Sequence, residues 1–175
     1  MNWVALAVVG IGWVISAALH AQECNSQVVA TTPSSVFTIN SDGTVTDNRT
    51  GLVWDACNWG KSGADCTAGS ATHYSWQDAL AQAALANGAN YKGYNDWRLP
   101  NIKELMSLVE RRCQGPAINL DIFPNASSNP LWSASPLVSG SGASWTLRMD
   151  KGSVYYVIHN EFWGVQVRLV RGGND

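Results

Sequence analysis

Four cysteines in a chain that begins like an exported protein constrain this fold more than any other feature. Ahead of the first cysteine, an uncharged apolar run extends from Trp3 to Leu19 and ends in the small-residue stretch Ala17–Ala21. An apolar run that ends in small residues is typical of a secretory signal peptide. We therefore predict a signal peptide over residues 1–21 and a mature domain over residues 22–175, secreted to the periplasm or the extracellular medium.

The apolar run leaves one alternative open. No Lys or Arg precedes it, and its length is at the short limit of a membrane span. A retained N-terminal anchor is therefore the alternative to cleavage. No second apolar run of comparable length follows, so we predict no membrane association once the signal peptide is removed.

Export makes disulfide bonds the default state of the cysteines, because compartments outside the cytoplasm are oxidising. Four cysteines allow three pairings. Cys57 and Cys66 lie close together in a Gly-containing stretch, which predicts a bridge that closes a short loop. Cys24 and Cys113 would then form the second bridge and tie the mature N-terminus to the end of a helix. This pairing leaves no catalytic thiol, and the CxxC or HxxxH spacing of zinc ligands is absent, so we predict no metal site.

Composition narrows the remaining choices. A length of 175 residues suits one domain, and nine tryptophans supply material for a core. Charged residues make up only 14%, against roughly 25% in an average soluble domain. The formal net charge is −2, and no basic cluster exceeds the pair Arg111–Arg112. We therefore predict no nucleic-acid partner.

Hydrophobic spacing predicts strands at both ends of the mature domain and two helices between them. Asp42-Gly43 between two β-prone runs indicates a hairpin. Ser75 is a candidate N-cap for a first helix that Asn87-Gly88 would end. Asn101 with Glu104 resembles a capping box for a second helix. The expected strands cover 36–40, 44–47, 52–54, 143–149, 153–158 and 165–171, and the second helix is expected over 102–110.

Residues 114–143 have no long periodicity and contain four prolines. We predict an irregular region there, held in place by Phe123, Leu131 and Trp132. The fold class that follows is α+β: two helices with a small antiparallel sheet and a long irregular loop region, stapled by disulfides.

A set of short motifs is spread along the mature chain. It comprises Thr44-Val45-Thr46-Asp47, Thr50-Gly51-Leu52-Val53-Trp54, Trp76 with Ala79-Leu80, Asp96-Trp97-Arg98-Leu99-Pro100-Asn101-Ile102-Lys103-Glu104-Leu105, Phe123-Pro124, Trp132-Ser133 and Val167-Arg168-Leu169-Val170-Arg171. Together the motifs resemble the Lcl C-terminal domain family, named for the end of a bacterial collagen-like adhesin. The resemblance covers about residues 36–172 and implies a C-type-lectin-like fold.

In that adhesin the domain is associated with sulfated glycosaminoglycans and with attachment, and the resemblance implies a similar role here. Binding a polysulfate requires a basic surface, whereas this chain is slightly acidic overall. Only local patches would serve. The candidates are Lys103, Arg111 and Arg112, or Arg148, Lys151 and Arg168.

The segment between the last two expected strands is the candidate ligand site. Asn160 and Glu161 could accept hydrogen bonds from sugar hydroxyls or bind calcium, and Trp163 could stack on a sugar ring. His159 completes this predicted site. The segment Asn95-Asp96-Trp97 has the residue types of a calcium-lectin motif, but their order and their place in the chain differ from that motif. We therefore interpret this segment as a turn. Calcium binding is not specifically indicated, and no cofactor is predicted.

Catalytic patterns are missing from the sequence. Neither GxSxG nor HExxH occurs, and His73 and His159 have no nucleophile beside them in the sequence. We predict a secreted, non-catalytic recognition or adhesion module that binds a glycan or a surface protein through the 121–163 loop surface. The alternative is a structural subunit of an exported surface assembly, such as a pilus or fibre, and an enzyme is the third choice.

Overall fold

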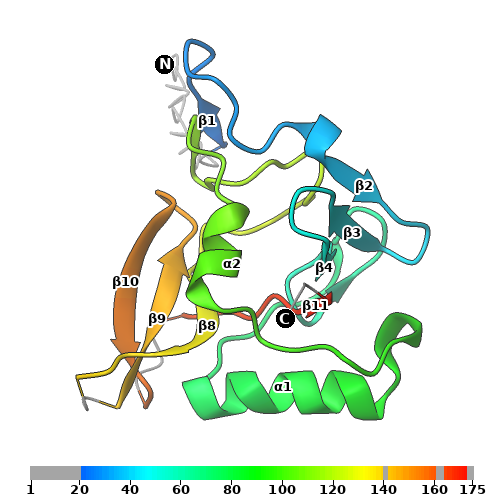
Figure 1. The fold of residues 1–175 in the computed structure, drawn as a ribbon, viewed down its shortest axis with the longest axis vertical. Helices are drawn as coiled ribbons and strands as arrows, with labels where there is room; N and C mark the ends of the chain where they lie inside the picture. Colours follow the sequence, from blue (N-terminus) through cyan, green and yellow to red (C-terminus); the bar gives the residue numbers. More distant parts are fainter. Residues whose placement is uncertain (1–20, 140–141, 161–163, 173–175) are drawn as a thin grey trace, which may run out of the picture.

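The computed structural model describes residues 21–139, 142–160 and 164–172, so nearly all of the predicted signal peptide lies outside the described chain (Figure 1). The first sheet has four antiparallel strands in the order β11-β4-β3-β2. The predicted hairpin is confirmed, and its turn uses Gly43, whose φ of 78° suits glycine. The strands are β2 (Phe37–Ile39), β3 (Thr44–Asp47), β4 (Leu52–Asp55) and β11 (Val170–Gly172).

A second antiparallel sheet has the order β10-β9-β8. Its strands are β8 (Leu131–Pro136), β9 (Ala143–Arg148) and β10 (Ser153–Ile158). The strands predicted over 143–149 and 153–158 are confirmed as β9 and β10, but β8 falls inside the region expected to be irregular. Its pairing with β9 shifts register between Trp132 and Pro136, so the strand lacks a regular alternation that the sequence could reveal.

Two further pairs of short strands are associated with the disulfides. One pair contains the Cys24–Cys113 bridge, and the other lies beside the Cys57–Cys66 bridge. Both predicted bridges are present, Cys24–Cys113 and Cys57–Cys66. Cys24 and Cys113 are themselves opposite each other in the ladder, so the bridge and the pairing fix the same contact. The pairs are β1 (Glu23–Cys24) with β7 (Cys113–Gln114) and β5 (Lys61–Ser62) with β6 (Ala68–Gly69).

The two helices begin where their caps predict. The helix α1 (Trp76–Gly88) follows Ser75, whose hydroxyl accepts the Asp78 amide. Asn101 and Glu104 form the full capping box of α2 (Ile102–Ser107). This helix is shorter than predicted, because the chain leaves it after Ser107 and pairs Val109 with Ile118 in an isolated bridge. Single turns of 3₁₀ helix cover η1 (Ser34–Val36) and η2 (Tyr91–Gly93).

The three-stranded sheet separates two hydrophobic cores. Alternation along its strands sends Leu131 and Leu147 into the core that contains α2, and Trp132 and Val157 into the core that contains α1. Figure 1 shows the arrangement: β8–β10 stand on one side, the four-stranded sheet on the other, α2 lies between them in this view and α1 runs below. The α+β class with two helices is therefore confirmed, with several sheets instead of the single small sheet expected.

The segment expected as a strand over 165–171 is extended and buried, but only Val170–Gly172 joins a ladder. Its backbone bonds go to several elements in turn, including the Trp59 amide to the Val167 carbonyl and the Asp55 amide to the Leu169 carbonyl. The side chains still alternate: Val165, Val167 and Leu169 enter the α1 core, whereas Gln166 and Arg168 point the other way into polar partners.

Arg168 is a deeply buried arginine, with an exposed fraction of 1%. Its guanidinium donates to the carbonyls of Asp55 and Ala56 at 2.7 and 2.6 Å and to Asn58 Oδ1. The Phe123 ring lies 4.9 Å from the guanidinium carbon. Burial lowers the pKa of Arg168 to about 10, so the side chain stays charged at neutral pH.

Replacing Arg168 by Met should lower the free energy of unfolding by about 3–5 kcal/mol, because three buried acceptors lose their donors. Denaturant unfolding with the disulfides intact measures the change. Arg111→Met, at an exposed arginine, is the matched control and should leave the unfolding midpoint nearly unchanged. Equal midpoints for the two variants would contradict a structural role for Arg168.

Glu110 fixes the chain that follows the mature N-terminus. The carboxylate is buried and accepts the amides of Thr31, Thr32 and Arg112 at 3.1, 3.0 and 3.2 Å. Burial acts to raise the pKa of Glu110, but these hydrogen bonds outweigh it and hold the pKa below its ordinary value of 4.5.

A carboxyl group with a lowered pKa in the folded state adds stability above its unfolded pKa and loses it as the pH falls through the folded value. Glu110→Gln should therefore flatten the loss of stability below about pH 4.5. Unfolding midpoints measured over an acid series test this, with the exposed Asp121→Asn as the control. An unchanged acid limb in the Glu110 variant would contradict the assignment.

Candidate functional site

The predicted site falls at the end of β10 and is only partly within the described residues. His159 and Asn160 are described, whereas Glu161 and Trp163 lie outside. His159 Nε2 lies 2.8 Å from the Ser144 hydroxyl on β9, and its ring stacks on Trp76 of α1 with centroids 4.2 Å apart. The imidazole therefore ties the sheet to α1, and Asn160 beside it is exposed.

The Ser144–His159 contact is a nucleophile–base type of pair that the sequence did not reveal. The two residues are 15 positions apart and meet only because β9 and β10 pair antiparallel. Ser144 is 0% exposed. Its hydroxyl orients the imidazole from within the protein and is not presented to solvent.

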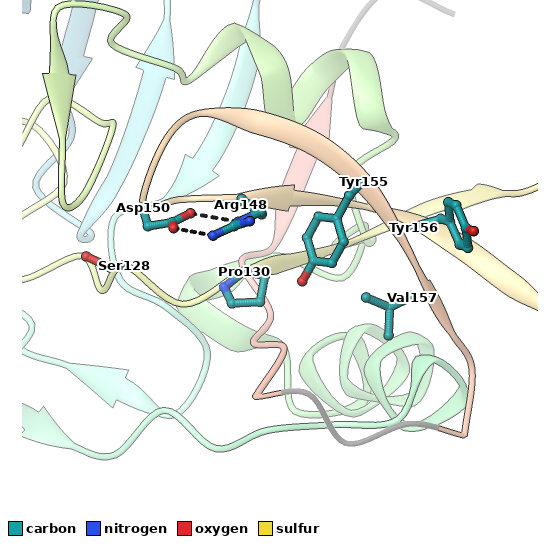
Figure 2. A pocket seen from close by; sticks show the side chains of 7 residues that line it. All are labelled: Ser128, Pro130, Arg148, Asp150, Tyr155, Tyr156 and Val157. Atoms are coloured by element: carbon teal, nitrogen blue, oxygen red, sulfur yellow. Dashed lines mark hydrogen bonds and ion pairs between the residues drawn. The ribbon is translucent and has the colours of Figure 1, made fainter.

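A surface pocket of about 460 Å³ lies farther along the same strand (Figure 2). Tyr155 and Val157 project to one side of β10, and Tyr156 projects to the other, as strand alternation requires. The full lining is Ser128, Pro130, Arg148, Asp150, Tyr155, Tyr156 and Val157.

The polar wall of the pocket is an ion pair at the β9–β10 turn. Arg148 Nε lies 3.0 Å from Asp150 Oδ1, and one Nη lies 2.5 Å from Oδ2, so the contact is bidentate. Hydrogen bonding from Arg148 holds the pKa of Asp150 below its ordinary value, and hydrogen bonding to Asp150 raises the pKa of Arg148. Both groups remain charged at neutral pH, and their charges compensate each other.

Tyr155 supplies the aromatic wall. The Arg148 guanidinium carbon lies 5.9 Å from its ring centroid, and the ring is half-buried against the α1 core. Partial burial raises the pKa of the Tyr155 hydroxyl, so this group is neutral and can donate or accept a hydrogen bond. The pocket thus combines an aromatic ring, apolar contacts from Pro130 and Val157, and donors beside acceptors.

Such a pocket suits a neutral polyhydroxy ligand. A hydroxyl group can donate to the Asp150 carboxylate while its neighbour accepts from an Arg148 N–H that the ion pair does not use. Carbon-bound hydrogens of a sugar ring match the face of a tyrosine. Within residues 21–139, 142–160 and 164–172, no group of three or more His, Cys, Asp or Glu side chains could hold a metal ion.

Most tryptophans of the described chain belong to the cores. Trp54, Trp97 and Trp132 are buried, and Trp76 is partly buried against the α1 core. Trp145 is half-buried and meets Tyr156 edge to face, with ring centroids 6.4 Å apart, on the side of the sheet away from the pocket.

The predicted basic patches need correction. Arg168 is buried and cannot contribute to a surface patch, because it bonds to internal carbonyls. The structure instead places Lys151 with Arg111 and Arg112 around a second hollow of about 490 Å³ beside the Cys24–Cys113 bridge. Glu23 lines the same hollow and offsets part of its charge.

Residues 43–171 match the family model of the Lcl C-terminal domain. No curated protein matches the chain. None of the helices in the described ranges is long and apolar enough to cross a membrane.

The Arg148–Asp150 ion pair can be tested against a second arginine–aspartate pair that lies outside the pocket. Arg171 pairs with Asp96 at 2.7 Å and lies over Tyr94, but this trio does not line the pocket. Removing an arginine should raise the pKa of its own carboxyl partner toward the ordinary value of 3.8.

Carboxyl-carbon NMR titration measures both aspartates in each variant. Arg148→Met should move Asp150 and leave Asp96 unchanged, and Arg171→Met should do the reverse. An Asp150 titration that is the same with and without Arg148 would show that the ion pair does not form in solution.

Proposed function

The chain belongs to the Lcl C-terminal domain family, and we propose that it is an exported, non-catalytic recognition module that binds a neutral saccharide in the pocket beside Tyr155. The pocket lies inside the 121–163 surface predicted from the sequence. Its lining carries the proposal: one half-buried aromatic ring faces a charge-compensated pair of hydrogen-bonding side chains. Aromatic stacking with a few polar contacts is how proteins commonly hold small polar ligands.

The charge of the site favours a neutral sugar over a polysulfate. Arg148 is the one basic residue of the pocket lining, and its charge is compensated by Asp150 at hydrogen-bond distance. An added sulfate group would have to compete with that carboxylate for the guanidinium. A sugar hydroxyl uses both partners without breaking the pair.

The proposal includes a secreted location and a C-type-lectin-like arrangement. Two disulfides support export, because such bonds persist in oxidising compartments. Two helices on opposite sides of the three-stranded sheet, with an irregular stretch from Gly115 to Pro130 leading into β8, support the lectin-like arrangement. All four cysteines are in disulfide bonds, so none of them is a free thiol that could act as a nucleophile.

A glycan array with the mature chain, residues 22–175, tests the function. Binding to a neutral saccharide is expected with and without calcium. Tyr155→Ala and Arg148→Met should each weaken binding about tenfold or more, because each removes one wall of the pocket. Arg171→Met changes an equivalent exposed pair outside the pocket and should bind like the natural chain.

Failure to bind any neutral glycan would overturn the proposal. Binding that is limited to sulfated glycans and insensitive to Arg148→Met would point to the hollow lined by Arg111, Arg112 and Lys151 instead. Absence of glycan binding together with an uncleaved N-terminus, read from the mass of the exported protein, would favour the pilus or fibre subunit.

A further inference from the structure

The strand β10 is the outer edge of the three-stranded sheet. The strand order β10-β9-β8 leaves one side of β10 without a neighbour in the described chain. Figure 1 shows β10 as the outermost element on that flank of the molecule. The opposite edge, β8, has a parallel bridge from Leu131 to Gln166, so the exposed edge of the sheet is β10.

The register tells which backbone groups of β10 point outward. The His159 amide donates to the Gly142 carbonyl, and this pair continues the β9–β10 ladder. In an antiparallel pair the hydrogen-bonded positions alternate, so Tyr155 and Val157 also bond toward β9. The amide and carbonyl groups of Val154, Tyr156 and Ile158 therefore face away from the sheet.

This edge lacks the usual protection against pairing. Natural proteins block exposed edges with charges, prolines or bulges. The six residues Ser153–Ile158 carry no charge and no proline, and their pairing with β9 has no register shift. Two of the three residues whose backbone groups face outward also have exposed apolar or aromatic side chains. These are Tyr156, which is 55% exposed, and Ile158, which is 42% exposed.

We propose that β10 pairs antiparallel with β10 of a second copy of this chain, about a two-fold axis at Tyr156. The outward groups of Val154, Tyr156 and Ile158 are symmetric about Tyr156, so one axis there satisfies all of them in both copies. Tyr156 then lies opposite its own symmetry mate, and Val154 opposite the second copy's Ile158. The strand has no charged residues, so the pairing brings no like charges together. Aromatic and β-branched residues opposite each other stabilise an antiparallel ladder.

The same register joins the two pockets. Tyr155 and Val157 lie on the pocket side of β10, so Tyr155 of one copy would lie opposite the second copy's Val157. Each pocket would then continue into the other across the new ladder. An oligosaccharide long enough to reach both would bind with the gain of a bivalent ligand, and this consequence alone rests on the proposed function.

Sedimentation or light scattering of the mature chain over a wide concentration range tests the pairing. The natural chain should reach the mass of a dimer, and Ile158→Lys should remain a monomer, because a lysine on the shared edge opposes pairing. The matched control is Ile39→Lys, at a 62% exposed isoleucine on β2, the edge of the other sheet, which should still form the dimer. Far-UV circular dichroism and thermal unfolding confirm that both variants fold.

The outcomes separate pairing from ligand binding. A natural chain that stays monomeric at all concentrations, or an Ile158→Lys variant that still dimerises, would overturn the inference. If a dimer forms but no saccharide binds, the pairing stands and the proposed function fails. If both stand, Ile158→Lys should keep its affinity for a single sugar and lose about tenfold or more for a long oligosaccharide.

Discussion

The buried guanidinium of Arg168 is the contact on which the rest of the structure depends. It reaches from the C-terminal segment to the end of β4, to Asn58 at the start of the disulfide loop and to the Phe123 ring in the irregular region. Three parts of the chain that are distant in sequence, residues 55–58, the region of Phe123 and the C-terminal segment, thereby meet at one group. A buried charge is unfavourable unless it is hydrogen-bonded, and here the two Nη atoms of Arg168 have partners whereas its buried Nε has none. Losing any of the Nη partners would therefore leave this charge still less compensated.

The same segment supports the pocket. Gln166 lies two residues before Arg168, and its side-chain oxygen accepts a hydrogen bond from the Ser127 hydroxyl. The backbone amide of Gln166 donates to the Pro130 carbonyl at 2.8 Å. The Trp132 amide in turn donates to the Gln166 carbonyl at 3.0 Å. Pro130, which lines the pocket, is therefore held by the segment that carries Arg168. An irregular loop is made rigid here by buried polar contacts in place of a regular ladder.

Local chemistry could be predicted from the sequence, and contacts between distant segments could not. The hairpin at Gly43, the capping box of Asn101 with Glu104 and the short disulfide loop each depend on residues within about ten positions of one another. The strand β8 was missed because its register shift removes the period of two. Ser144 meets His159, and Arg168 is buried, only once the sheets have formed. An alternating run such as 165–171 looks the same whether its polar residues face water or internal carbonyls.

Most of the few basic side chains in the described chain have partners within the protein, which limits their use in attracting a ligand. Within the described ranges, six lysine or arginine side chains form ion pairs with carboxylates, and Arg168 is enclosed. Most charges of this small set therefore serve to hold loops and turns, and few remain to attract a polyanion over a distance. Recognition would then depend on contacts made at short range, by rings and by hydrogen-bonding groups. The pocket beside Tyr155 offers such groups, and its neighbour β10 offers an uncharged edge, so both features follow from a surface with few free charges.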